Sequence, residues 1–222
     1  MKFSESIQNG TLLCDGAIGS LLFERTGRLS EYNHNYESFN IDRPEIVTEI
    51  HLEYLLAGAQ LLTTNTFSCN LAHLSIHNQA HRLEEMNQAG VQRVRDAIQL
   101  FNKQHSNRQD LFVAGSIGPT PKVNESPEEI RALYTPQILA LVESGIDAIL
   151  LETFSSREHV RTMLEVINQL EDPPPVIVQM SLRKNNNGIW NHDPTEFVEE
   201  TARLGASVVG VNCCAPSDAS SF

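Results

Sequence analysis

Thiols and carboxylates that end apolar runs are the side chains of this sequence best placed to do chemistry. Residues 206–214 form an apolar, β-branched run that stops at Asn212, Cys213 and Cys214, which is typical of a buried strand carrying polar groups to the edge of a sheet. Asp15 and Glu152 end two earlier runs of the same kind. A cysteine thiolate is a soft zinc ligand. A carboxylate buried at a strand end favours a cationic ligand such as an ammonium group.

Each of these residues also has a purely structural interpretation. Adjacent cysteines are not a C-x-x-C pair, a zinc site needs three or four ligands, and cysteine is common in protein cores. Asp15 and, less readily, Glu152 could instead cap the helix that follows. The histidines show no metal-binding spacing, and we expect His51 and His81 at the surface or the edge of the core. At this point both interpretations of the thiols and carboxylates stay open.

Apolar runs followed by a polar residue or glycine predict six strands, at 12–16, 60–65, 111–115, 148–153, 176–180 and 206–214. Helical periodicity and capping signals predict helices at 17–27, 44–57, 77–103, 126–145, 156–170 and 193–204. Pro136 is expected to kink or restart its helix. Residues 28–42 and 183–188 are predicted to be loops. This alternation of strand and helix predicts parallel βαβ units.

Two architectures suit such units. A doubly wound sheet normally has a glycine-rich phosphate turn after its first strand, and residues 15–19 lack the G-x-G-x-x-G pattern. A (β/α)8 barrel collects its functional side chains at the carboxyl ends of its strands, where the polar signals of this sequence stand. We therefore predict an α/β fold of the TIM-barrel type. A whole barrel takes about 250 residues, so the chain should hold about six of the eight βα units.

Composition narrows the choice of partner. The formal charge of −12, from 28 acidic and 16 basic residues, argues against nucleic acid or an anionic membrane surface. No segment approaches the roughly 20 apolar residues of a membrane span, and the first residues lack the apolar core of a signal peptide. We expect a cytoplasmic protein with small-molecule partners. The four cysteines are too few for a disulfide framework and are expected to be reduced thiols.

Five segments, in their order and separations, closely resemble the homocysteine S-methyltransferase (homocysteine-binding) domain family, and more the methionine synthase N-terminal branch than its other branches. They are Asp-Gly-Ala-Ile-Gly at 15–19, Thr-Asn-Thr-Phe at 64–67, Gly-Ser-Ile-Gly-Pro at 115–119, Glu-Thr-Phe at 152–154 and Gly-Val-Asn-Cys at 210–213. The resemblance covers residues 12–213. It implies one homocysteine-binding barrel domain over residues 1–222, which transfers a methyl group to the sulfur of homocysteine and forms methionine.

The resemblance also implies roles for single residues. Cys213 matches a zinc ligand, and Asp15 and Glu152 match the acids that hold the homocysteine ammonium group. The further substrate-binding residues that it implies are Thr64, Asn65, Thr66, Ser116 and Asn212. Zinc would deprotonate the homocysteine thiol, so no side chain has to serve as general base and none is assigned a catalytic role. The implied methyl donor is linked to folate or cobalamin.

The chain departs from the family at its C-terminal end. The other zinc ligands of the family lie in a Gly-Gly-Cys-Cys-Gly segment, which has no match here. We therefore expect an incomplete domain that a completing domain or self-association would finish. The alternative is a catalytically inactive fragment that binds homocysteine or another amino acid without zinc. An unrelated barrel enzyme with Cys213 as nucleophile is less favoured, because no histidine stands out as its base.

Overall fold

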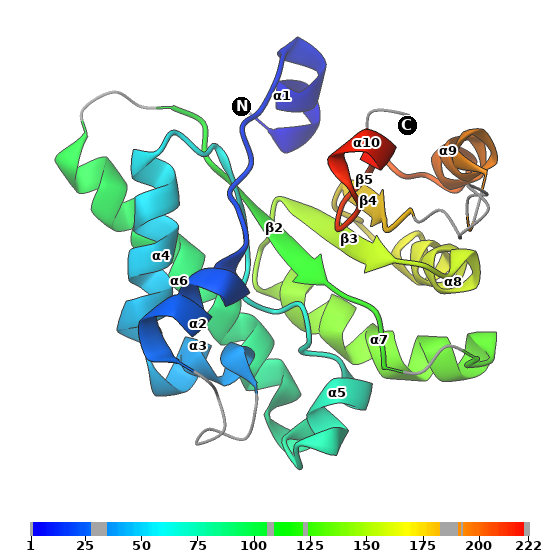
Figure 1. The fold of residues 1–222 in the computed structure, drawn as a ribbon, viewed down its shortest axis with the longest axis horizontal. Coiled ribbons are helices and arrows are strands. Elements are labelled where there is room, and N and C mark those ends of the chain that lie inside the picture. Colours follow the sequence, from blue (N-terminus) through cyan, green and yellow to red (C-terminus); the bar gives the residue numbers. More distant parts are fainter. Residues whose placement is uncertain are drawn as a thin grey trace.

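The protein forms one parallel sheet whose outer side is covered by helices (Figure 1). The structure, a computed structural model, describes residues 2–27, 35–105, 109–121, 124–182, 191 and 193–219. The strands are β1 (Leu61–Thr63), β2 (Phe112–Ile117), β3 (Ala148–Phe154), β4 (Val176–Met180) and β5 (Val208–Val211). They lie in the order β1-β2-β3-β4-β5, and every neighbouring pair is parallel.

This strand order confirms the predicted α/β fold of the TIM-barrel type. Strands that follow one another around the sheet in sequence order build the wall of a barrel, whereas a doubly wound sheet reverses its order at one point. Within the described residues the wall does not close, because β1 and β5 have no contact that would join them into a ring. The sheet is therefore an open, curved wall with a helix-covered outer face and an inner face.

Helices before, between and after the strands complete the fold. They are α1 (Phe3–Asn9), α2 (Ile18–Thr26), η2 (Tyr36–Ser38), α3 (Phe39–Asp42), α4 (Pro44–Leu56), α5 (Leu71–Ile76), η3 (Ala80–Arg82), α6 (Leu83–Gln104), α7 (Pro127–Glu143), α8 (Arg157–Ile167), α9 (Pro194–Arg203) and α10 (Pro216–Ala219). The capping box predicted at the start of α7 is present, with Ser126 and Glu129 bonded reciprocally to each other's backbone.

Several predicted elements differ from the observed ones. The strand predicted at 12–16 is reduced to one parallel bridge between Cys14 and Leu61, supported by a 3.0 Å bond from the Asp15 N–H to the Leu61 carbonyl. Helix α6 begins at Leu83 and not at 77, and α7 continues through Pro136 without restarting. The described part of the loop predicted at 28–42 contains η2 and α3. The loop predicted at 183–188 lies outside the described residues.

The two faces of the sheet alternate along each strand. In β3, Ile149 and Leu151 belong to the large hydrophobic cluster between the sheet and helices α6, α7 and α8, while Ala148 and Leu150 belong to a smaller cluster on the inner face. The inner cluster consists of Phe3, Leu61, Phe112, Ala114, Ala148, Leu150 and Ile177. Phe3 of α1 contacts Phe112 edge to face at 5.5 Å, so α1 covers one end of the inner face.

His51 is a correction to the sequence analysis. It lies in α4, which packs against both α2 and α6, and it is fully buried with no hydrogen-bond partner for either ring nitrogen. Desolvation lowers its pKa to about 3. The expected position at the surface or core edge is wrong, because α4 is covered on two sides. His81, in η3, is exposed as predicted.

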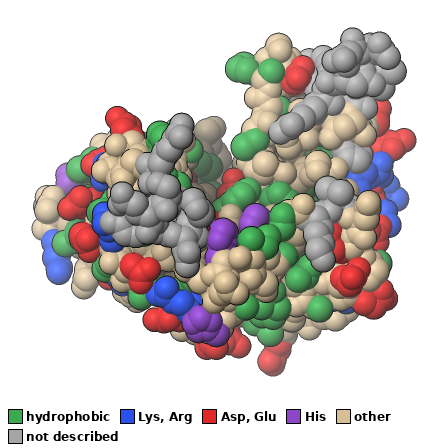
Figure 2. Space-filling model, turned by 60° about the horizontal axis from the view of Figure 1, so that its bottom comes forward, with side chains coloured by type: hydrophobic (Ala, Val, Ile, Leu, Met, Phe, Trp, Pro, Cys, Tyr) green, Lys and Arg blue, Asp and Glu red, His purple; other side chains and the backbone are tan. Residues whose placement is uncertain are grey.

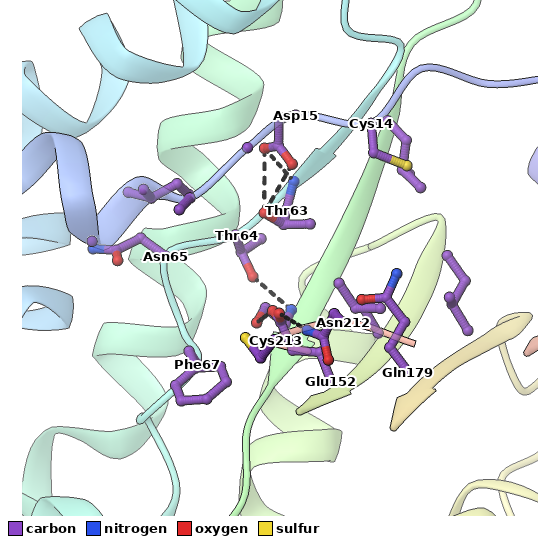
Figure 3. Close-up of a pocket in the computed structure, with 18 of the residues that line it drawn as sticks. Cys14, Asp15, Thr63, Thr64, Asn65, Phe67, Glu152, Gln179, Asn212 and Cys213 are labelled. Carbon is purple, nitrogen blue, oxygen red and sulfur yellow. Dashed lines mark hydrogen bonds between the residues drawn. The ribbon is translucent and has the colours of Figure 1, made fainter. Parts of the chain in front are cut away.

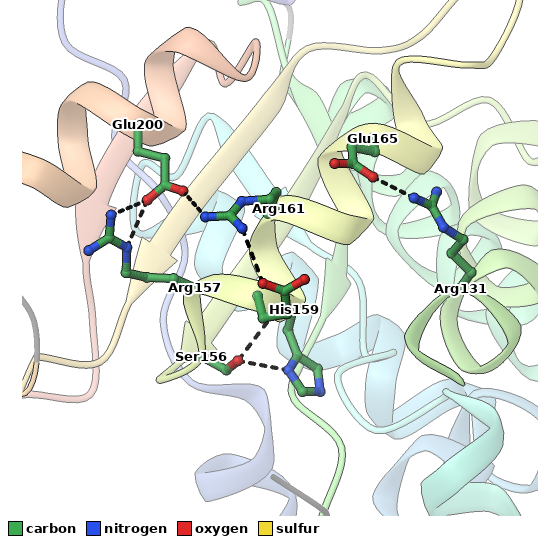
Figure 4. Close-up of polar contacts among 8 residues, drawn as sticks. Arg131, Ser156, Arg157, His159, Arg161, Glu165 and Glu200 are labelled. Atoms are coloured by element: carbon green, nitrogen blue, oxygen red, sulfur yellow. Dashed lines mark hydrogen bonds and ion pairs between the residues drawn. The ribbon is translucent and has the colours of Figure 1, made fainter. Parts of the chain in front are cut away.

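Ion pairs connect helices α8 and α9 (Figure 4). Glu200 of α9 accepts from Arg161 of α8 at 2.5 Å and also from Arg157, which in turn reaches Glu196 at 3.1 Å. A single exposed ion pair stabilises a fold by about 1 kcal/mol at most. Here two arginines, Arg157 and Arg161, pair with the same carboxylate, Glu200. None of the helices in the described ranges is long and apolar enough to cross a membrane.

Candidate functional site

A cavity of about 960 Å³ lies along the inner face and reaches the carboxyl ends of the strands, where Glu152, Asn212 and Cys213 line it. The space-filling view shows the molecule hollowed between its two halves (Figure 2). The cavity is lined by the predicted site residues Asp15, Thr64, Asn65, Ser116, Glu152, Asn212 and Cys213, which come from five separate segments of the chain. All of them except Ser116 are labelled in Figure 3. The predicted residue Thr66 does not line it and is fully buried behind the turn that follows β1.

Asp15 is held at one wall of the cavity by β1. Its carboxylate accepts a 2.8 Å bond from the Thr63 backbone N–H and bonds of 3.1 and 3.2 Å from the Thr63 hydroxyl (Figure 3). Burial nevertheless raises the pKa of Asp15 to about 7, and the nearby Glu152 carboxylate adds to this rise. The hydrogen bonds tie Asp15 to the neighbouring strand, so it is not a free helix cap.

Glu152 stands at the end of β3, on the inner face. Its carboxylate accepts from the Ser116 hydroxyl at 2.5 Å and from the Asn212 side-chain amide at 3.1 Å. Burial raises the pKa of Glu152, although the bond from Ser116 opposes that effect. Ser116 and Asn212 thus fix the direction of the carboxylate, and they do so with neutral donors.

The described residues that line the cavity include three acids, Asp15, Glu37 and Glu152, and no Lys, Arg or His. Glu37 has a structural role, since it is buried and its carboxylate accepts a 2.8 Å bond from the Ser68 backbone N–H. Asp15 and Glu152 have only neutral donors around them. Partly buried carboxylates without a cationic side chain are stabilised when a cationic ligand binds between them.

The turn after β1 is stabilised by a buried chain of hydroxyl groups. The Thr64 and Thr66 hydroxyls lie 2.6 Å apart, the Thr66 hydroxyl donates to the Ser116 carbonyl at 2.7 Å, and the Ser116 N–H donates to the Thr64 hydroxyl at 3.0 Å. Thr66 therefore supports the site from behind. Asn65 bonds to Asn40 and to the carbonyl of Tyr36, which connects the turn with α3 and η2.

The start of helix α2 forms a further part of the cavity wall. Helix α2 begins at Ile18, and Ala17, at its N-cap, gives no side-chain cap. Residues Gly16, Ala17, Ile18, Gly19 and Ser20 line the cavity next to Asp15. The start of a helix carries partial positive charge and unpaired N–H groups that suit a carboxylate. The cavity thus offers acids for a cation and a helix end for an anion.

Cys213 follows β5 and lines the cavity. It is exposed, has a positive φ of 49°, and its sulfur is 3.5 Å from the Thr153 hydroxyl. Cys14 also lines the cavity, from the opposite side in Figure 3. Across the described ranges, no three His, Cys, Asp or Glu side chains gather as a metal-binding group. These residues supply one predicted zinc ligand and not the three or four that a zinc site needs.

Sequence reasoning missed three residues of the site. Thr63 binds Asp15, Thr153 contacts both Asn212 and Cys213, and Gln179 of β4 lines the inner wall. The period of two along the strands could have placed Gln179 on the inner face, since Glu152 pairs with it across β3 and β4. The position of Thr153 depends on a local irregularity of β3 that has no signal in the sequence.

The chain is similar in sequence to methionine synthases and to betaine–homocysteine S-methyltransferases. It is 27% identical over 221 residues to a methionine synthase of Mycobacterium leprae, covering 94% of this chain and 18% of that protein. It is also 27% identical over 175 residues to betaine–homocysteine S-methyltransferase 1 of Xenopus tropicalis, covering 78% of this chain and 42% of that protein. The chain therefore spans less than half the length of these relatives.

Solved structures agree on the fold. The homocysteine methyltransferase MmuM of Escherichia coli superimposes with a TM-score of 0.84 in its metallated form and 0.82 in its oxidized form, at 21% and 22% identity. Each match covers 97% of this chain, and the metallated form is covered to 79% of its length. A sequence model of the homocysteine S-methyltransferase family matches residues 12–222. The chain belongs to the homocysteine S-methyltransferase family.

Proposed function

We propose that this chain is a homocysteine-binding S-methyltransferase domain that transfers a methyl group to the sulfur of homocysteine and releases methionine. The domain occupies residues 1–222, and it works in the cytoplasm on small molecules, with no nucleic acid or membrane as partner. The observation that carries this proposal is the pair Asp15 and Glu152, two partly buried carboxylates in one cavity that has no cationic side chain among its described lining residues. An amino acid offers the ammonium group that such a pair requires.

The cavity also suits the other end of an amino acid. A substrate whose ammonium group lies between Asp15 and Glu152 can direct its carboxylate to the start of α2, which lines the same wall. The side chain then extends toward Cys213. Thr64, Asn65, Ser116 and Asn212 complete the wall around it, while Thr66 holds the turn in place. Fixed at both charged ends, the substrate presents its sulfur in one orientation.

Cys213 is the residue of this chain that would bind zinc in such an enzyme. A bound zinc ion would lower the pKa of the homocysteine thiol, so that the sulfur reacts as a thiolate without a general base. The metallated form of MmuM is consistent with a metal in this fold. Because the described residues supply only one such ligand, we propose that a completing domain or a second copy of the chain supplies the others.

The methyl donor is proposed to be linked to folate or cobalamin, as the similarity to methionine synthase suggests. A donor must reach the substrate sulfur from outside the cavity. Cys213 is exposed, so the sulfur end of the substrate would lie near solvent and away from the part of the cavity that α1 lines. Assays with methylfolate and with methylcobalamin, each with zinc, would separate these two donors by the methionine formed.

Calorimetry with L-homocysteine tests the substrate assignment. We expect Glu152→Gln and Asp15→Asn each to weaken binding by about tenfold or more, because a charge-assisted hydrogen bond contributes about 1.5–3 kcal/mol. Glu165→Gln is the matched control, since this acid pairs with Arg131 on the outer helices, and it should bind like the wild type. An analogue without the amino group, 4-mercaptobutyrate, should not bind. Unchanged affinity in both acid variants would refute the assignment.

A second candidate function is favoured by the incomplete metal set. With no metal-binding group of three in the described part of the chain, the protein could bind homocysteine or another amino acid without catalysing methyl transfer. Zinc analysis of the purified chain separates the two functions. About one zinc per chain together with methionine formation supports the enzyme. Homocysteine binding that persists after treatment with a chelator, with no zinc bound, supports the binding protein.

A further inference from the structure

Thr153 occupies an irregular position beside both functional groups at the end of β3. We propose that Thr153 is a positioning residue for Cys213, and that Asn212 fixes the Thr153 hydroxyl and the Glu152 carboxylate together. The roles of Cys213 and Glu152 in this proposal rest on the proposed function. The arrangement itself rests on the contacts between these four residues.

Thr153 is the extra residue of a β-bulge. Glu152 pairs with Gln179 of β4 and Phe154 pairs with the next residue, Met180, so Thr153 has no partner in the ladder. Its φ of 66° lies in the left-handed region, which is unfavourable for a β-branched residue. The bulge turns Phe154 to the outer face, where it is fully buried, and leaves Glu152 on the inner face. Strain of this kind persists only when neighbouring groups hold it.

The Asn212 side chain provides that hold. Its oxygen accepts from the Thr153 backbone N–H at 3.0 Å, and its amide nitrogen donates to the Thr153 hydroxyl at 2.9 Å and to Glu152 at 3.1 Å. Both amide hydrogens are therefore used, and the backbone N–H freed by the bulge is satisfied. Asn212 follows β5 and Thr153 belongs to β3, so this one side chain bridges two strands across β4.

The hydroxyl of Thr153 lies between Asn212 and the Cys213 sulfur. It accepts from Asn212, so its own hydrogen can point to the Cys213 sulfur, 3.5 Å away. The backbone of Cys213 is held as well, because its carbonyl accepts from the Ser181 hydroxyl at 3.3 Å. The sulfur and the Glu152 carboxylate are consequently connected through Asn212 and Thr153, so that their separation is set by the protein before any ligand binds.

The proposal is tested by the reactivity of Cys213 in a matched pair of variants. Thr153→Ser and Thr153→Ala both lose the methyl group and differ only in the hydroxyl. Alkylation by iodoacetamide is measured at a pH at which the thiol is ionised, and mass spectrometry follows Cys213 separately from Cys14 and Cys214. A hydrogen-bond donor reduces the nucleophilicity of a thiolate, so we expect Thr153→Ala to react about threefold faster than Thr153→Ser. The serine variant should match the wild type.

Ligand affinity supplies the second readout, with L-homoserine, the thiol-free analogue of homocysteine, as probe. Asn212→Ala removes a donor to Glu152 and should weaken L-homoserine binding several-fold, whereas Thr153→Ala should leave this affinity within about twofold. A merely structural role of Thr153 would lower both readouts together. Circular dichroism confirms that each variant is folded.

The outcomes separate this proposal from the proposed function. If the wild type binds neither homocysteine nor homoserine, the proposed function fails, while the alkylation rates still decide the role of Thr153. Equal alkylation rates of Thr153→Ala and Thr153→Ser would overturn the positioning role, whatever the ligands do. Faster alkylation of Thr153→Ala together with unchanged L-homoserine affinity would support it.

Discussion

The two faces of the sheet are built from the same strands but differ in what they contact, since the outer face packs against helices and the inner face lines the cavity. Leu150 and Leu151 are adjacent in β3, yet Leu151 points into the helix-covered core and Leu150 into the wall of the cavity. The outer face gathers most of the buried apolar side chains, whereas the inner face has a small apolar cluster and the acids of the site. Because successive side chains of a strand point to opposite faces, one face of the sheet packs the core and the other lines the cavity.

The largest expected contrast comes from those two leucines. Leu151→Ala should lower the free energy of unfolding by about 3–5 kcal/mol, because it leaves a cavity in a packed core. Leu150→Ala should cost about 1–2 kcal/mol, because its side chain already borders an open cavity. Urea denaturation of both variants measures the difference. Equal losses would show that the inner wall is packed as tightly as the outer one.

Glycines on the two faces sharpen the contrast. A Cβ at Gly115 would lie 2.9 Å from Ile146 and 3.1 Å from Leu141, both on the outer side, whereas one at Gly210 would meet nothing within 4 Å. Gly115→Ala should therefore destabilise the protein by about 1–3 kcal/mol through overpacking. Gly210→Ala should change stability by about 0.5 kcal/mol or less. Thermal unfolding distinguishes them, and a large loss in Gly210→Ala would mean that another element covers β5.

The inner face should also carry a pH dependence, through Asp15. Its pKa rises from 3.8 in the unfolded chain to about 7 in the folded one, so the folded state holds a proton that the unfolded chain releases between these values. The free energy of unfolding should consequently fall as pH rises from about 4 to about 7. Asp15→Asn should remove this part of the slope and add on the order of 2 kcal/mol at pH 8, allowing for solvent screening. Denaturation at pH 4 and pH 8 measures both effects.

The pKa of Asp15 also affects homocysteine binding, and affinity should change with pH in the opposite direction to stability. An ammonium ligand needs the ionised carboxylate, so homocysteine affinity should rise between pH 6 and pH 8 in the wild type. Calorimetry at both values provides the comparison. An affinity that is independent of pH in this interval would argue against contact between Asp15 and the ammonium group.

The helix-covered side has its own titratable residue in His51. Its pKa is lowered to about 3, so below pH 6.5 the unfolded chain takes up a proton that the folded chain does not. The free energy of unfolding should therefore fall as pH falls below 6.5. His51→Leu removes two buried nitrogens without partners and should add about 1 kcal/mol at pH 7 and more at pH 5. His81→Leu, at an exposed position, is the control; a slope unchanged in His51→Leu would contradict the assignment.

Much of the fold follows from patterns that are local in the sequence. Helix α6 illustrates this, since its apolar residues recur at helical spacing and Leu83, Met86, Val94, Ala97 and Phe101 are all buried. The strand predicted at 176–180 coincides with β4. These elements are long or strongly periodic, so their own residues determine both type and buried side.

Other features depend on contacts that no local pattern contains. Residues 36–42 lack a period, yet Asn40 is buried because its amide donates to the carbonyls of Asn65 and Met86. The segment at 12–16 forms only a bridge because a single residue, Cys14, pairs with β1. Asp15 and Glu152 were found by their positions at strand ends, but their neutral donors and the bulge at Thr153 arise from neighbouring strands.

The simple strand order has a consequence for the way the chain acquires its structure. Each strand from β2 to β5 pairs with the strand made before it, and a helix follows each strand in the sequence. A chain leaving the ribosome can therefore add one strand and helix at a time to a surface that already exists. Asp15 joins the sheet first through β1, and Asn212 arrives last with β5. Among the described strands β5 joins last, and the side chain of Asn212 then reaches Glu152 and Thr153.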